Sequence, residues 1–260
     1  MTKFFSDIKK YRDYMLHSAK SELKAEVANS YLNWIWWILE PLCFMAIYAF
    51  IFTYVFKGKV QHLTAFIFIG ITLWDFFSRM LKSSVRLVRN KRSILSKIYV
   101  PKYILIFEKI AVNSFKMAIS LVMVAILMII TKVSLTVQVL WIIPIIFSLE
   151  ILTMGLSMWL LHFGVYVDDL MNITDIGLRL LFYVTGVFYN LEGRIKGDAC
   201  HILLHLNPMA FYINAMRNAL LYGKMPEISW LIAWTVVGVV ISFFGILLIQ
   251  KNENNYVKVI

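Results

Sequence analysis

The sequence predicts an all-α membrane protein of six transmembrane helices, with an N-terminal amphipathic interfacial helix and an outer re-entrant helical hairpin between spans five and six. Of its 260 residues, 60% are hydrophobic and 16% are charged, whereas roughly 25% are charged in a typical soluble domain. The apolar residues form long runs, which is typical of chains whose solvent is a bilayer. The net charge of +11 comes from basic residues concentrated in alternate connections, which is the sidedness signal of a membrane protein.

A transmembrane helix needs about 20 consecutive, mostly apolar residues. Six stretches meet or nearly meet this length: Trp34 to Phe56, Leu63 to Val85, Ile104 to Ile130, Val139 to Val165, Ile176 to Tyr189, and Ile228 to Ile249. The fifth stretch is short, and we expect it to begin near Leu170 and to keep Asp175 and Arg179 close to the cytoplasmic face. Residues 1–260 are therefore predicted to form a single transmembrane domain.

A seventh apolar stretch, Ile202 to Leu221, carries too many polar side chains to face lipid. Asn207 followed by Pro208 favours a break between two short helices, because Asn is a preferred N-cap and Pro is favoured at the first helical position. Non-helical backbone at membrane depth persists only where protein or water covers it. We therefore predict a re-entrant outer hairpin over residues 191–223 instead of a crossing.

Lys and Arg concentrate in the N-terminal segment, in the connection after the second span and in the C-terminal tail. Basic loops stay on the cytoplasmic side of a membrane. Both termini and residues 86–101 are therefore predicted to be cytoplasmic, which requires an even number of crossings.

The first 30 residues carry apolar side chains at helical spacing: Phe4, Ile8, Tyr11, Met15, Ala19 and Leu23. This spacing predicts an amphipathic helix. Our interpretation is that residues 1–30 lie in the cytoplasmic interface of the membrane. A solvated helix that packs on a partner remains the alternative.

The chain contains no phosphate-binding loop and no catalytic or metal-binding motif that we recognise. We therefore predict neither an enzyme nor a metal site. If the protein works against a gradient, the energy would come from a partner or an ion gradient. Two ion pairs are expected within the spans. Asp75 and Arg79 lie one helical turn apart, and Lys116 and Glu150 are expected to meet between neighbouring spans.

Several short motifs, taken in order, carry a resemblance to a known family. They are residues 30–42 at the start of the first span, Trp74-Asp75-Phe76-Phe77, Lys97-Ile98-Tyr99-Val100-Pro101, Val165 to Asp169, and Leu206-Asn207-Pro208 followed by Arg217 and Gly223. The chain resembles permease subunits of type-2 ATP-binding-cassette exporters, in the branch that exports lipid-linked polysaccharides such as O-antigen and teichoic acid. Asp168 departs from the family pattern, which usually has Arg before Asp169.

The resemblance implies a homodimer that couples to two separate ATP-binding-cassette ATPase subunits. ATP and Mg would bind to those subunits, so this chain would hold no cofactor. Contacts with the ATPase would be made by five residues of the cytoplasmic coupling segment: Asn90, Arg92, Lys97, Tyr99 and Pro101. The expected substrate is a polyisoprenoid-diphosphate-linked glycan in the bacterial cytoplasmic membrane. Membrane lipids are further expected partners, and no nucleic-acid partner is expected.

Aromatic rings bind the apolar faces of sugars without requiring one sugar sequence. The candidate channel residues on the first and fifth spans are Trp34, Trp37, Tyr48, Phe52, Phe182, Tyr183, Phe188 and Tyr189. Interfacial anchoring remains the alternative for these rings. The candidate head-group contacts are Arg12, Lys20, Arg86 and Arg89, and the candidate outer gate comprises Asn207, Pro208, Tyr212 and Arg217.

Three other functions remain open. The first is export of a drug or lipid by the same class of permease. The second is an intramembrane transferase, for which Asp168, Asp169 and Asp175 form the only acidic cluster. The third is a secondary transporter, which usually shows an internal repeat, and we find no convincing similarity between the two halves of the chain.

Overall fold

The computed structural model describes the chain except for residues 1, 29, 52–53, 55–61, 192–197 and 260. The described residues form helices and connections, without a strand. The helices are α1 (Thr2–Lys10), α2 (Arg12–Val27), α3 (Trp36–Phe50), α4 (Leu63–Val85), α5 (Leu87–Asn90), α6 (Arg92–Leu95), α7 (Lys102–Ile130), α8 (Ile142–Tyr166), α9 (Leu170–Val184), α11 (Asp198–Leu206), α12 (Pro208–Leu221) and α13 (Ile228–Val259), with short 3-10 turns η1 (Asn33–Ile35) and η3 (Val137–Trp141).

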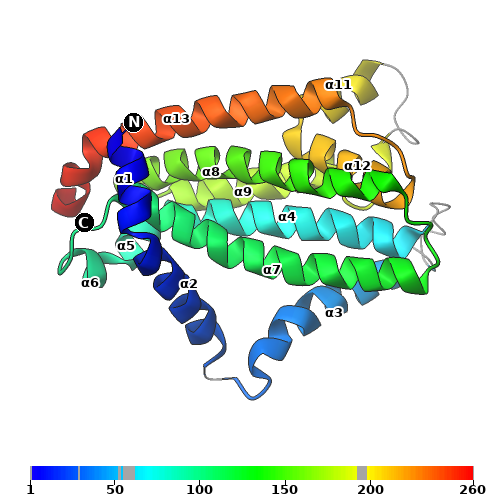
Figure 1. Cartoon of the computed structure of the whole chain (residues 1–260), viewed down its shortest axis with the longest axis horizontal. Helices are drawn as coiled ribbons and strands as arrows, with labels where there is room; N and C mark the ends of the chain where they lie inside the picture. Colours follow the sequence, from blue (N-terminus) through cyan, green and yellow to red (C-terminus); the bar gives the residue numbers. More distant parts are fainter. Residues whose placement is uncertain (1, 29, 52–53, 55–61, 192–197, 260) are drawn as a thin grey trace.

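Among the described residues, four segments are long and apolar enough to cross a membrane: Leu63–Val85, Lys102–Ile130, Val137–Tyr166 and Ile228–Glu253. Their most apolar windows differ in burial, with 78% of the α4 window inside the protein and 22–33% of the other three. Helix α4 is therefore the centre of the bundle, with α7 and α8 packed against it and α13 packed mainly on α8 (Figure 1). Helices α7, α8 and α13 present much of their surface outward.

The predicted and observed spans agree closely for these four helices. The second predicted span has the same bounds as α4, Leu63–Val85. Helices α3 and α9 have only 15 described residues each, which makes them about 22 Å long at 1.5 Å per residue. That length falls short of the roughly 30 Å of a hydrocarbon core, so the described part of these two helices does not reach the length of a crossing.

Both ends of the chain and the short helices α5 and α6 lie at one end of the bundle, whereas α11 and α12 lie toward the other (Figure 1). We refer to the first as the α5–α6 end. There, the Tyr11 hydroxyl donates to the Tyr99 carbonyl oxygen at 3.3 Å, and the Tyr99 hydroxyl donates to the Glu253 carboxylate at 2.7 Å. Partial burial beside Glu253 raises the pKa of Tyr99, which keeps this phenol a donor. The N-terminal helices, the predicted coupling segment and the C-terminal tail thus form one unit.

The N-terminal segment is two helices, because the backbone leaves helical geometry at Tyr11 (φ −98°, ψ 11°). The predicted apolar stripe is present, but the bundle covers it: Phe4, Ile8 and Met15 pack against the core, and Ala19 is buried. This differs from our interpretation of a helix that rests on lipid. Periodicity identifies an apolar face but does not say what covers it.

Helix α2 lies along the first half of α7 and is held there by polar contacts. The Ser18 hydroxyl donates to Glu108 at 2.6 Å, the Lys109 ammonium donates to Glu22, and Lys116 pairs with Glu26 at 2.6 Å. The predicted pair between Lys116 and Glu150 is therefore wrong. Glu150 instead accepts a hydrogen bond from Ser114 at 2.5 Å.

The predicted break between two short helices is confirmed at Asn207. Its side-chain oxygen accepts from the backbone N–H groups of Met209 at 3.1 Å and Ala210 at 3.3 Å, with Pro208 at the first helical position. These bonds satisfy two of the donors that a helix N-terminus leaves open.

We expect Asn207→Ala to destabilise the protein by about 1 kcal/mol, because both capping bonds to α12 are lost. The measurement is the thermal unfolding midpoint in detergent. Asn207→Ser is the control, since Ser retains a capping oxygen and is expected to keep most of the stability. Equal losses for the Ala and Ser variants would contradict a capping role.

Candidate functional site

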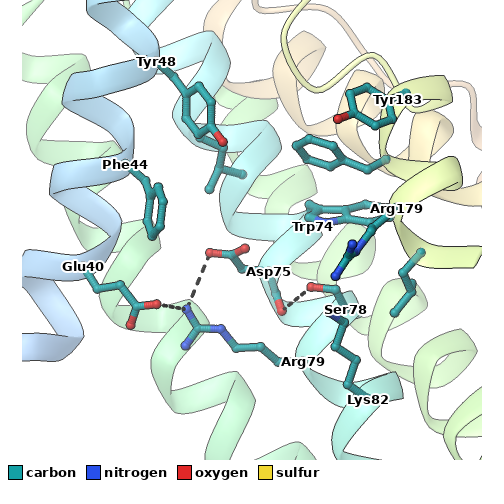
Figure 2. Close-up of a pocket in the computed structure, with 13 residues that line it drawn as sticks. Glu40, Phe44, Tyr48, Trp74, Asp75, Ser78, Arg79, Lys82, Arg179 and Tyr183 are labelled. Carbon is teal, nitrogen blue, oxygen red and sulfur yellow. Dashed lines mark hydrogen bonds and ion pairs between the residues drawn. The ribbon is translucent and has the colours of Figure 1, made fainter. Parts of the chain in front are cut away.

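A groove of about 380 Å³ lies between α3, α4 and α9 (Figure 2). Its lining joins three helices that are far apart in the sequence. The lining residues are Glu40, Phe44 and Tyr48 from α3; Ile71, Trp74, Asp75, Ser78, Arg79 and Lys82 from α4; and Leu178, Arg179, Phe182 and Tyr183 from α9. The α4 positions recur every three or four residues, so they share one helix face.

One part of the groove is aromatic. The ring of Phe182 lies 5.2 Å from that of Trp74 and 5.2 Å from that of Phe188, and the Phe188 ring lies 4.5 Å from that of Tyr48. Tyr183 adjoins Phe182 and is largely exposed. Offset and tilted aromatic pairs of this kind are stable packing arrangements. They present a continuous set of rings from α3, α4 and α9 along the groove.

The other part is charged. Arg79 contacts Glu40 of α3 at 3.3 Å and Asp75 of its own helix at 3.6 Å, as the dashed lines of Figure 2 show. The pair of Asp75 and Arg79 predicted from spacing is thus confirmed. Lys82 pairs with Asp175 of α9 at 2.8 Å. The Arg179 side chain extends over the groove (Figure 2), and no carboxylate pairs with it among the described side chains.

The aromatic and charged parts lie at opposite ends of the groove. On α3, Tyr48 lies at the aromatic end and Glu40 at the charged end. On α4, Trp74 lies at the aromatic end and Lys82 at the charged end. Helix α4 ends at Val85, next to α5. The charged part therefore lies nearer the α5–α6 end of the bundle.

Comparison with known proteins places this architecture in a family. Residues 17–221 match the family described as ABC-2 type transporter. The chain belongs to this family. It is 24% identical over 259 residues, 99% of both chains, to the O-antigen export system permease protein RfbA of Myxococcus xanthus. Two proteins of the same name from Klebsiella pneumoniae are each 20% identical over 249 residues, 95% of both chains. This ABC-2 transporter chain is thus a multi-pass membrane permease.

The remaining predicted channel aromatics of the transporter lie apart from the groove or at its edge. Trp34 is exposed in η1. Trp37 faces α7, where its ring lies 5.6 Å from that of Phe115, and it lines a smaller cavity of about 30 Å³ between α3, α4 and α7. The Tyr189 hydroxyl donates to the Tyr183 carbonyl at 2.6 Å. Phe52 lies outside the described residues.

The predicted head-group cations do not form one site. Arg12 and Lys20 are exposed on α2, and Arg86 is exposed between α4 and α5. Arg89 is held by the connection between α8 and α9, since its guanidinium donates to the Val165 carbonyl at 3.2 Å and pairs with Asp168 at 2.5 Å. The cations that line the groove are instead Arg79, Lys82 and Arg179.

The predicted coupling residues gather at the α5–α6 end of the transporter. Asn90, Arg92 and Lys97 are exposed, and Tyr99 is exposed apart from its bond to Glu253. Pro101 is buried and stands at the N-cap position of α7. Four of the five therefore present side chains outward, where another protein can reach them.

Two predicted outer-gate residues are buried anchors. The Tyr212 hydroxyl lies 2.7 Å from the Ser148 hydroxyl of α8. Arg217 is 3% exposed, and its guanidinium lies 3.4 Å from the ring centroid of Phe66. With Asn207 as the N-cap and Pro208 at the first turn, this part of the predicted gate fixes α12 to α4, α8 and the turn after α9.

The sequence interpretation did not assign the α4 wall of the groove. Trp74 and Asp75 were used there for the family resemblance and for charge neutralisation, and Lys82 only for sidedness. A signal was available, because residues 71, 74, 75, 78, 79 and 82 follow helical spacing, and three of them, Asp75, Arg79 and Lys82, are ionisable groups within a span. Such groups in a membrane helix indicate a protein-facing or water-facing surface.

Proposed function

We propose that the chain is the permease half of an ATP-driven exporter that moves a polyisoprenoid-diphosphate-linked glycan across the bacterial cytoplasmic membrane, with both termini in the cytoplasm. Family membership supports an ABC-type permease, and relatives that match nearly the whole chain are named O-antigen export permeases. O-antigen or a similar surface glycan such as teichoic acid is therefore the proposed cargo class. The chain itself would hold no catalytic site or cofactor.

The observation that carries this proposal is the division of the groove into a charged part and an aromatic part. With the α5–α6 end in the cytoplasm, Arg79, Lys82 and Arg179 lie where the diphosphate of a lipid-linked glycan would arrive. Charge-assisted bonds from Arg suit phosphate oxygens. The rings of Trp74 and Phe182 then provide flat apolar surfaces for the sugars farther across the membrane.

The groove is open along one side, which favours a homodimer. Helix α9 buries only Thr174 and Leu178. Large apolar side chains are exposed on both helices that flank the groove: Trp36, Phe44, Ile47 and Phe50 on α3, and Ile173, Ile176, Leu180 and Tyr183 on α9. A second copy placed against these faces would close the channel. In that assembly α3 and α9 would complete the six crossings.

The ATPase subunits, with ATP and Mg, would dock on the exposed face of residues 86–101 and transmit their closure to the bundle. The paired helices α11 and α12 would form the re-entrant outer hairpin and gate the exit. The capped break at Asn207 supports this hairpin, because it turns the chain between two helices too short to cross.

The experiment that tests the function is deletion of the gene in its native host, with complementation by the intact chain. We expect the lipid-linked glycan to accumulate inside the cell and to be lost from the surface, which labelled sugar incorporation with fractionation measures. Normal surface glycan together with increased sensitivity to a drug would instead favour the drug-exporter alternative.

We expect Tyr183→Ala and Arg179→Gln each to lower glycan export about tenfold while the amount of folded permease stays constant. Both side chains line the groove and are exposed, so little packing is lost when they are changed. Phe147→Ala is the matched control, because Phe147 is an exposed aromatic on α8 outside the groove. An equal loss of export for the Phe147 variant would contradict the assignment.

A further inference from the structure

A direct contact joins the predicted coupling segment to the connection that leads into α9, the helix that forms one wall of the groove. Arg89 belongs to α5, and its guanidinium pairs with Asp168 at 2.5 Å while donating to the Val165 carbonyl at 3.2 Å. Val165 lies in the last turn of α8, where carbonyl oxygens lack helical partners. Asp168 lies in the connection that leads into α9 at Leu170. Arg89 therefore holds the elbow between α8 and α9.

The first part of this elbow is fixed to α4. A Cβ atom added at Gly164 would lie 1.9 Å from the Val85 carbonyl oxygen, so the ends of α8 and α4 touch through their backbones. The end of α8 therefore cannot move closer to α4. Movement at the elbow must be taken up by the residues that follow it, which are Val167 to Asp169 and α9.

Helix α9 is held loosely beyond this elbow. It buries only Thr174 and Leu178. It is also tied to α4 by the pair of Asp175 with Lys82 and by the ring contact of Phe182 with Trp74. Leu181 packs against the core. Within one copy of the chain, a helix with so few fully buried residues can tilt as a unit at low energetic cost. Tilting it would move Arg179, Phe182 and Tyr183 and change the width of the groove.

We infer that the Arg89–Asp168 pair is the relay through which displacement of the coupling segment tilts α9 and changes the groove. The inference rests on the proposed docking of an ATPase at residues 86–101. It assigns both residues a positioning role in transport, and it gives Arg89 a partner within the chain in place of a lipid head group. Asp168 has the sign needed to pair with Arg89.

The pair is suited to transmission because it contributes little to folding. The side chain of Asp168 is 83% exposed and that of Arg89 is 37% exposed, and exposed ion pairs add little stability. Variants of the pair are therefore expected to fold, with an unchanged unfolding midpoint. The effect on transport can then be separated from an effect on stability.

The test uses the full permease purified with its ATPase subunits and placed in lipid vesicles. A reporter cysteine is introduced as Gly177→Cys, because no atom of the same copy lies within 4 Å of a Cβ added there. Position 177 lies on the α9 face proposed to meet the second copy, so its labelling reports movement of α9 relative to that copy. The native cysteines are removed as Cys43→Ser and Cys200→Ser. The readout is the rate of maleimide labelling at position 177 with and without Mg-ATP.

In the reporter protein we expect Mg-ATP to change the labelling rate by at least about threefold, as a shift between two populations of α9. Arg89→Asp and Asp168→Arg should each abolish this change while the ATPase still co-purifies and hydrolyses ATP. The double swap Arg89→Asp with Asp168→Arg should restore part of it, because the ion pair re-forms with reversed charge whereas the bond to the Val165 carbonyl does not.

Asp169→Arg is the matched control, since Asp169 is the neighbouring acid and no ion pair to it is found among the described side chains. We expect it to keep the response to Mg-ATP. Single variants that respond like the reporter protein, or a double swap that stays unresponsive, would overturn the relay. Failure of the reporter protein itself to bind an ATPase would instead overturn the proposed function, and the relay with it.

Discussion

Arg217→Met is expected to destabilise the transporter by about 3–5 kcal/mol, because it removes a buried guanidinium that joins three parts of the chain. The Nε atom of Arg217 donates to the Phe66 carbonyl of α4 at 3.0 Å. Its two terminal nitrogens donate to the Gly186 carbonyl at 2.9 Å and the Val187 carbonyl at 2.6 Å. The Phe66 oxygen keeps its helical donor within α4. However, the variant leaves the Gly186 and Val187 oxygens without the Arg217 donors at a buried position. The measurement is the unfolding midpoint and the monodisperse fraction in detergent.

Two further variants identify the cause of that loss of stability. Lys224→Met removes an exposed cation near the end of α12 and is expected to change stability by less than about 0.5 kcal/mol. Arg217→Lys keeps the charge but lacks the planar fork that reaches several acceptors, so we expect an intermediate loss. If Arg217→Met left the unfolding midpoint unchanged and only stopped export, Arg217 would act as a gate and not as an anchor.

The four long apolar helices were predictable because the bilayer imposes a simple rule on the sequence. A helix that crosses lipid must be long and apolar, and Leu63 to Val85 satisfies this rule with the same bounds in sequence and structure. The break at Asn207 was predictable for an equally local reason, since its side chain caps the helix that starts one residue later. Features determined by a few neighbouring residues could thus be predicted.

Contacts between helices were not predictable in the same way. Lys116 and Glu150 were placed at similar depth, but depth does not say which helix lies alongside, and Lys116 instead meets Glu26 of α2. Trp37 and Tyr48 are eleven residues apart and share a helix face, yet Trp37 contacts Phe115 of α7 and Tyr48 contacts Phe188. Helix α3 crosses the bundle obliquely (Figure 1), so one face meets different neighbours at its two ends.

Some residues of the candidate site were likewise predictable from the sequence, and others were not. Tyr48, Phe182, Tyr183 and Phe188 were selected by residue type and gather at the groove. The cations of the groove were not selected as head-group contacts, because the sequence interpretation looked for them in cytoplasmic loops. Whether an Arg faces lipid, a carboxylate or a groove depends on the helices packed against it, and that arrangement is a property of the tertiary structure.

Gly164→Ala and Gly177→Ala make the same chemical change and are expected to have opposite effects on stability. In an exposed helix, Ala is favoured over Gly by about 1 kcal/mol, and nothing lies within 4 Å of an added Cβ at Gly177. Gly177→Ala should therefore raise the unfolding midpoint slightly. At Gly164 the new atom would lie 1.9 Å from the Val85 carbonyl oxygen and 2.8 Å from the carbonyl carbon.

The Gly164 clash involves backbone atoms, so no side-chain rotation relieves it, and α8 must move away from α4 to reach the ordinary contact distance of 3.4 Å or more. Overpacking of this kind costs about 1–3 kcal/mol and occasionally more, which exceeds the gain in helix propensity. We therefore expect a lower unfolding midpoint for Gly164→Ala in parallel melts of the two variants. An unchanged or raised midpoint for Gly164→Ala would show that α8 and α4 do not touch there. Arg89 binds the connection between α8 and α9 beside this contact. Gly164→Ala should therefore also reduce the effect of Mg-ATP on labelling at position 177, even in the fraction of protein that folds.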